Sequence, residues 1–255
     1  MSKIWIVAYF TFKELLKSKV LLNVFFCGLG LMLVTYVATE FTYGVPEKVA
    51  LDFGIGILSL SSLAISLFLG VTLLSKEIDS RTVYMVISRP VPRYAFILGK
   101  IFGLLGIQLV NVFLLSGMTI LTVKLLGGPI SPLIYWCIAF TFLESVVLLL
   151  VVLLVSLFAN TVLATLFSVI ILILGHAVKE TQNINFVKRN PVFEYLLDFY
   201  HYFLPAFYKL NLKDFLIYKT TLDIEYLFST MIYGVTYSSF LIILILLIFN
   251  RKNLD

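Results

Sequence analysis

Two charged residues, Glu77 and Arg81, lie in a segment, 76–98, that separates two long apolar runs of the chain. They are four positions apart with the acid first, which is the favourable order for an ion pair on one face of a helix. The run 83–87 would form the apolar side of the same short helix. A soluble loop has no reason to expose such a run, so the segment predicts a docking surface. An ordinary loop whose charges anchor helix ends is the plainer alternative.

Prolines limit this predicted helix. Pro90 directly follows Arg89 and disfavours the helical conformation there, so the helix should end near Ser88. Pro92 comes next and suits the first turn of a following helix. The chain is therefore expected to turn before it enters its next apolar run.

Three polar residues lie inside apolar runs, where they must be paired or functional. An ionised Glu144 facing lipid would cost about 3 kcal/mol or more, so it is expected to face protein or water. It is either a pathway or gating residue or a structural partner for a neighbouring helix. Gln108 and Asn111 are three positions apart and favour hydrogen bonds between helices, with a pathway lining as the alternative. His176 is expected at the membrane interface.

The sequence lacks the motifs of several common enzyme classes. Gly99-Lys100 has neither the upstream glycine of a phosphate-binding loop nor the following Ser or Thr that would hold magnesium. No HExxH or GxSxG arrangement occurs, and no spacing of His, Cys, Asp or Glu suggests a metal site. We therefore expect no enzyme activity and no cofactor or metal in this chain.

The composition describes a protein dissolved mainly in lipid. Of 255 residues, 61% are hydrophobic and only 13% are charged. These values predict an integral membrane protein rather than a soluble domain. The net charge of +5 does not indicate nucleic acid, because Lys and Arg lie mostly at the ends of apolar runs. Anionic lipid head groups are the expected counter-charge there.

The apolar runs predict an all-α fold with six transmembrane helices, because a helix needs about 20 residues to cross about 30 Å of hydrocarbon. An amphipathic stretch at the N-terminus predicts a further helix on the membrane surface. The predicted division is an interfacial helix at 1–19, spans at 20–39, 53–75, 101–123, 133–158, 161–178 and 226–250, the docking segment 76–98, and an outer segment at 179–223.

Two features of the spans predict how they pack. The run 133–178 is too long for one crossing, so it is expected to fold back at 159–161, where Asn and Thr can satisfy backbone groups at helix ends. Small residues recur every four positions at Ser62, Ser66 and Gly70. This ridge predicts the close approach of a neighbouring helix.

The distribution of basic residues predicts the orientation. Eleven of the nineteen Lys and Arg lie in the N-terminal arm, in the docking segment extended to Lys100, and in the C-terminal tail. Nine of the fourteen acids then fall on the opposite side. Because cytoplasmic loops are enriched in Lys and Arg, we expect both termini in the cytoplasm and the protein in the cytoplasmic (inner) membrane.

The docking segment resembles that of the permease subunits of type 2 ABC transporters, the class that includes the nitrous-oxide-reductase maturation permease. The wider layout is also similar, with an interfacial helix, six spans and a large outer segment between the last two. The chain has Arg81 where that family often has Gly. The residues that carry the resemblance are, in order, Glu77, Thr82, the apolar run 83–87, Pro90, Arg93 and Gly99-Lys100.

The resemblance implies that the docking segment is a coupling helix that fits a groove on a separate cytoplasmic ATP-binding subunit. That partner would bind ATP and Mg and would drive transport, in the direction of export. The permease would act as a homodimer or with a related permease, and the outer stretch 193–211 would carry short helices that dip toward the outer leaflet. The residues implied in the ATPase contact are Glu77, Arg81, Thr82, Tyr84, Pro90, Arg93 and Lys100.

Two other classes of function stay open. An ion-coupled secondary transporter or channel would use Glu144 as its coupling carboxylate and would need no partner protein. A membrane scaffold would transport nothing.

Overall fold

The computed structural model describes residues 3–17, 20–41, 46–79, 92–181, 204–217 and 222–251, without the side chains at 20–25, 39–41, 73–79, 179–180, 214 and 217. Within these ranges the regular elements are helices, which confirms the all-α prediction. The outer stretch 193–203 lies outside the described residues, and so do four residues of the predicted ATPase contact: Arg81, Thr82, Tyr84 and Pro90.

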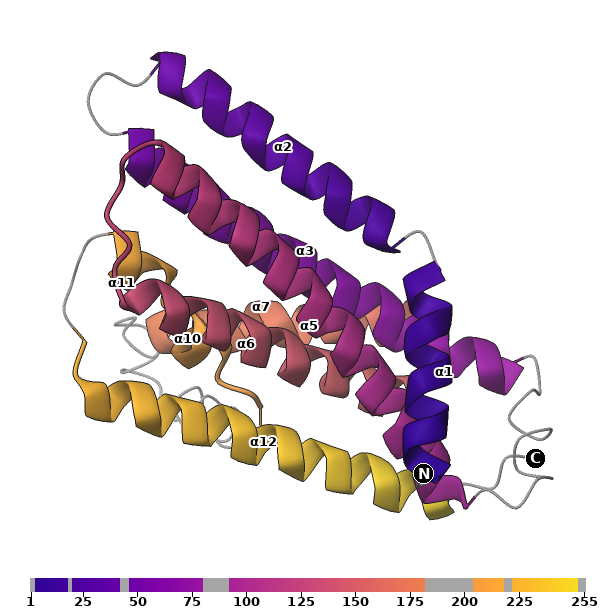
Figure 1. Cartoon of the computed structure of the whole chain (residues 1–255). Coiled ribbons are helices and arrows are strands. Elements are labelled where there is room, and N and C mark those ends of the chain that lie inside the picture. Colours follow the sequence, from indigo (N-terminus) through magenta and orange to yellow (C-terminus); the bar gives the residue numbers. More distant parts are fainter. Residues whose placement is uncertain are drawn as a thin grey trace.

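The described helices form a bundle with one helix lying across its end (Figure 1). Helix α1 crosses the end at which α3 ends, α5 begins and α12 ends (Figure 1). Helix α2 lies on the outside of the bundle against α3 and α5. In chain order the helices are α1 (Lys3–Lys17), α2 (Val20–Phe41), α3 (Pro46–Asp79), α5 (Arg93–Leu125), α6 (Leu133–Ser156), α7 (Thr161–Thr181), α10 (Phe207–Leu210), α11 (Lys213–Ile217) and α12 (Ile224–Arg251).

Five of these helices are long and apolar enough to cross a membrane: α3, α5, α6, α7 and α12. The chain is therefore a multi-pass membrane protein. Helix α2 contains 22 residues, of which Phe26–Ala38 form the described apolar part. A sixth span at α2 stays a prediction.

Two helices begin well before the spans that the sequence predicted. Helix α3 starts at Pro46 rather than at 53, and α5 starts at Arg93 rather than at 101. A proline stands at each start, where its fixed φ and missing N–H suit a helix N-terminus. With 34 and 33 residues, the two helices are each about 50 Å long and exceed the hydrocarbon thickness. Arg93 and Lys100 thus belong to a helix and not to a loop.

Helix α6 is the centre of the bundle. Its residues 144–153 are all buried, so this part of the helix is enclosed on every side, as expected of a helix that is hydrophobic all round. It packs against α3, α5, α7 and α12. The predicted fold-back is confirmed, because α6 ends at Ser156 and α7 starts at Thr161. The Asn160 carbonyl accepts the first hydrogen bond of α7 from the Ala164 N–H at 2.9 Å.

The small-residue ridge of α3 is the surface on which α6 packs. Ser66 Oγ donates a hydrogen bond to the Ser145 carbonyl at 2.8 Å. A Cβ atom placed on Gly70 would lie 2.8 Å from Val152 Cγ1, so only glycine permits this approach. The ridge therefore brings the two backbones together, as the sequence predicted.

A second ridge of glycines on α5 seats the crossing helix α1. A Cβ atom on Gly99 would lie 2.5 Å from Val7 Cβ, and one on Gly103 would lie 2.7 Å from Thr11 Cβ. The same holds at Gly106, where a Cβ would meet the Phe12 ring at 2.9 Å. These contacts hold α1 against the first half of α5, close to the segment that joins α5 to α3.

A methyl group on this ridge should destabilise the fold. Gly103→Ala is expected to cost about 2 kcal/mol of unfolding free energy because it overpacks the contact with Thr11. Gly117→Ala, on the same helix with open space around it, should be neutral or stabilising by up to about 1 kcal/mol. Denaturant unfolding in detergent, followed by circular dichroism, measures both. Equal stability of the two variants would contradict the glycine seat.

Candidate functional site

A polar cavity of about 280 Å³ lies between α3, α6 and the start of the short helix α11. We call it the polar cavity. On α6, the residues Cys137, Thr141 and Glu144 are spaced by four and three positions, so that they share one face of the helix. The other lining residues are Ile55, Gly56, Ser59 and Leu60 on α3, Asn211 between α10 and α11, and Lys213, the first residue of α11.

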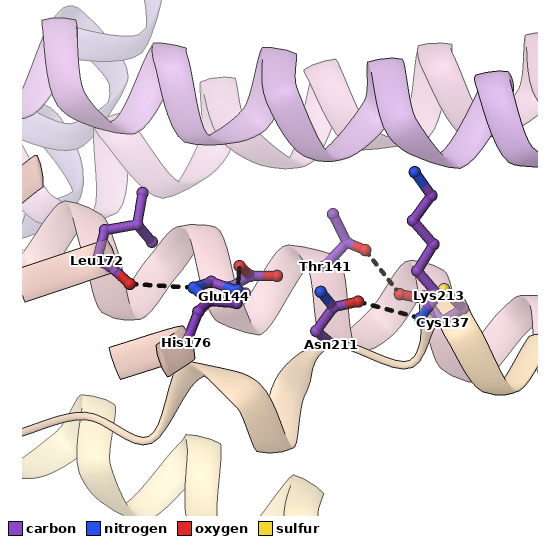
Figure 2. A network of polar contacts seen from close by, with 7 residues as sticks. All are labelled: Cys137, Thr141, Glu144, Leu172, His176, Asn211 and Lys213. Atoms are coloured by element: carbon purple, nitrogen blue, oxygen red, sulfur yellow. Dashed lines mark hydrogen bonds and ion pairs between the residues drawn. The ribbon is translucent and has the colours of Figure 1, made fainter. Parts of the chain in front are cut away.

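Glu144 forms the deep end of the polar cavity and is paired with a histidine. Glu144 as a whole is 3% exposed, and its Oε1 atom lies 3.2 Å from His176 Nε2 on α7. The other ring nitrogen, Nδ1, lies 3.0 Å from the Leu172 carbonyl oxygen (Figure 2). The histidine therefore links the acid to the backbone of the next helix.

This geometry fixes the number of protons in the pair. A carbonyl oxygen can only accept, so Nδ1 carries a proton that it donates to Leu172. The contact between Nε2 and Oε1 then holds one further proton, on the imidazole or on the carboxyl group. In either form the net charge of the pair is zero. A neutral pair explains how an acid is tolerated inside the bundle.

The segment before α11 closes over this pair. The Phe207 ring stacks on the His176 ring, with centroids 5.8 Å apart and planes 8° apart. Gly175 allows the close approach, because a Cβ there would lie 2.6 Å from the Pro205 carbonyl oxygen. On the other side, the Ala206 N–H donates to Tyr233 Oη at 2.8 Å and ties the segment to α12.

The mouth of the polar cavity carries a second charged pair. Lys213 Nζ lies 3.1 Å from Asp52 Oδ1 on α3. Asn211 Oδ1 accepts a hydrogen bond from the Lys213 N–H at 3.1 Å, which shapes the turn into α11 (Figure 2). Both members of the charged pair are partly exposed, so the pair itself contributes little stability. The pair matters instead because it places a charged group, Lys213, at the mouth of the polar cavity.

Gln108 and Asn111 lie away from the polar cavity, in hydrogen bonds between α5 and α3. Asn111 accepts from Ser61 Oγ and donates to Ser62 Oγ, both at 3.1 Å, and Gln108 Nε2 donates to the Ser62 carbonyl at 3.1 Å. Gln108 Oε1 is buried without a partner among the described residues. We call this set of contacts the α3–α5 seam.

Three of the residues that the sequence assigned to an ATPase contact are described. Glu77 lies in the last turn of α3, and Arg93 is the first residue of α5. Lys100 is only 8% exposed, with its Nζ 5.7 Å from the centre of the Phe96 ring. Little of Lys100 is therefore open to a partner, whereas Glu77 and Arg93 flank the segment at the end of the bundle.

Sequence reasoning missed the partner of Glu144. It placed His176 at the membrane interface, but the structure pairs it with Glu144. A signal was present, since Glu144 lies sixteen positions before Asn160 and His176 sixteen positions after it. A hairpin centred on Asn160 places both at the same depth. The Asp52–Lys213 pair has no such signal, because its members belong to distant parts of the chain.

Comparisons with known proteins identify no relative of this chain: no family model matches it, and no curated protein does. Within the described residues, no group of three or more His, Cys, Asp and Glu side chains could hold a metal ion. A function for this chain is therefore inferred from its own sequence and from the geometry of the described residues.

The Glu144–His176 pair should behave as one unit in a double-mutant cycle. His176→Leu leaves a buried acid without its partner and should destabilise the protein by about 3 kcal/mol. Adding Glu144→Leu should recover at least about 1 kcal/mol, because the unpaired acid is gone. Denaturant unfolding of the four proteins in detergent gives the coupling energy. Additive effects would contradict the pairing.

Proposed function

We propose that this chain is the membrane-spanning permease subunit of an ABC transporter of type 2. In this proposal a separate cytoplasmic subunit binds ATP and Mg, and the permease converts its movement into transport, in the direction of export. The chain itself carries no ATPase site. Two copies, or one copy and a related permease, form the translocation unit in the cytoplasmic membrane.

The observation that carries the proposal is the way α3 and α5 are joined. Both helices are longer than the hydrocarbon thickness, and α3 ends and α5 begins at the end of the bundle that α1 crosses, so the docking segment joins two long helices at that end (Figure 1). The α3–α5 seam couples the two helices within the bundle. A push on the segment would thus move two coupled helices, of which α3 also lines the polar cavity.

Helix α1 supports the same arrangement. Its inner side packs on the α5 glycine ridge, while Trp5, Tyr9 and Phe10 are exposed. Exposed aromatic residues on a helix that crosses the bundle suit the membrane interface. With α2 as a sixth span, both termini and the docking segment lie in the cytoplasm, where an ATP-binding subunit would contact them.

The proposal predicts that the docking segment holds an ATP-binding subunit. Tagged protein purified from its native membrane in mild detergent should retain a subunit with a Walker motif and vanadate-sensitive ATP hydrolysis. Glu77→Ala combined with Arg81→Ala should lower the retained subunit at least tenfold, because it removes the charges that fix the docking register.

A matched control is the double change Glu47→Ala with Lys124→Ala, at the opposite ends of the same two helices. It should retain the subunit at the wild-type level. The proposal fails if wild-type protein carries no ATP-binding subunit, or if the docking variant keeps it in full.

One observation favours a second candidate, an ion-coupled transporter or channel. Glu144 is a buried acid that borders a cavity and holds a proton jointly with His176. Such a group could load and release an ion without any partner protein.

Proton flux into liposomes that contain only this chain decides between the candidates. Under the ABC proposal, a pH-sensitive dye inside the liposomes should report no flux above that of empty liposomes. Flux that is abolished by Glu144→Gln would support the ion-coupled candidate instead.

A further inference from the structure

We propose that the polar cavity binds a small zwitterion, with its ammonium group at Glu144 and its anionic group at Asn211 and Lys213. The groups that line the polar cavity carry this assignment. The description of the bound molecule as the transported substrate rests on the proposed function, whereas the binding itself does not.

The deep end offers an acceptor. Only Oε1 of Glu144 is used by His176, and among the described residues Oε2 has no hydrogen-bond partner. Glu144 borders the polar cavity, so this oxygen is available to a donor inside it. An ammonium group would give a charge-assisted hydrogen bond, the strongest type that a carboxylate can accept from an organic ligand.

The mouth offers donors. Asn211 uses its Oδ1 atom in the turn to Lys213, which leaves its amide N–H₂ without a partner among the described residues. Lys213 has one contact with Asp52, and an ammonium group has three protons to donate. A carboxylate or phosphate of the ligand therefore fits this end.

The charge balance of the polar cavity excludes ligands that carry a net positive or a net negative charge. The Glu144–His176 pair and the Asp52–Lys213 pair are each neutral, so the polar cavity has no net charge to offer. A ligand with a net charge would be left uncompensated in a site of low dielectric constant. A zwitterion keeps the total at zero while its two ends meet groups of opposite sign.

The size of the cavity sets the scale of the ligand. Its volume of about 280 Å³ lies just below the range of pockets for drug-sized molecules. Cys137 and Glu144 are seven positions apart, so the α6 wall is about 10 Å long. A ligand of dipeptide size, or a phosphoethanolamine group, spans this distance.

Isothermal titration calorimetry tests the proposal with the full chain in phosphatidylcholine nanodiscs, because the headgroup of this lipid has no primary ammonium group. The probes are glycylglycine and sn-glycero-3-phosphoethanolamine, a phosphodiester whose net charge is zero, and they separate a free dipeptide from a lipid-type headgroup. The matched analogues are N-acetylglycylglycine, which lacks the ammonium group, and glycylglycine amide, which lacks the carboxylate. At least one zwitterion should bind, and each analogue should bind at least tenfold more weakly than glycylglycine if the dipeptide is the ligand.

Variants locate the binding. Glu144→Gln and Asn211→Ala should each weaken binding at least tenfold, and the exposed Asn211 keeps the test valid if the buried variant unfolds. Ser131→Ala, outside the polar cavity, should bind as the wild type does. The proposal is overturned if neither zwitterion binds at 10 mM, or if the blocked analogues or both cavity variants bind equally well.

The binding test and the purification from the native membrane together separate the two proposals. Absence of zwitterion binding with a retained ATP-binding subunit overturns only the ligand assignment. Zwitterion binding without an ATP-binding subunit overturns only the ABC proposal.

Discussion

The need to neutralise one buried acid governs the half of this protein that surrounds the polar cavity. Glu144 lies on α6, around which α3, α5, α7 and α12 pack, and its residue is only 3% exposed, so an ionised carboxylate there needs a compensating partner. His176 supplies the compensating group, and the Leu172 carbonyl fixes its tautomer. Phe207 then covers the imidazole, which places α10 and α11 over the polar cavity. The pairing of Glu144 thus joins α6 to α7 and to the segment before α11.

Close packing of helices through small residues governs the other half. The α3 ridge and the α5 ridge use small residues so that backbones touch, because van der Waals contact rather than the hydrophobic effect holds helices together in lipid. Helix α5 uses opposite faces for α1 and for the α3–α5 seam. It is therefore the element through which the crossing helix, the docking segment and the packed core are connected.

The sequence predicted those helices and turns that depend only on residues close together in the chain. Uncharged runs give the spans, and the excessive length of 133–178 gives its fold-back. The sequence predicted that Pro92 opens a helix, and α5 begins directly after it, but the start of α3 at Pro46 was missed, because hydropathy marks the membrane and not the helix end. The site was predicted in part, since Glu144 was expected to meet a group on a neighbouring helix, but His176 was not identified as that group.

The remaining features depend on non-local contacts. Gly99, Gly103 and Gly106 are visible as a ridge in the sequence, yet nothing there identifies α1 as the helix that covers them. Asp52 and Lys213 meet only because α11 folds back against α3. Pairing across such distances follows from the packing of the whole bundle and has no periodic signal along the chain.

The proposed function depends most on contact between an ATP-binding subunit and the segment that joins α3 to α5. Site-specific photocross-linking in the native membrane tests it, with a photoreactive residue at Tyr84 and, as the matched control, at the exposed Leu125 at the far end of α5. An adduct with a Walker-motif subunit from position 84 alone is the predicted result. No such adduct from position 84, or an equal yield from both positions, would contradict the account.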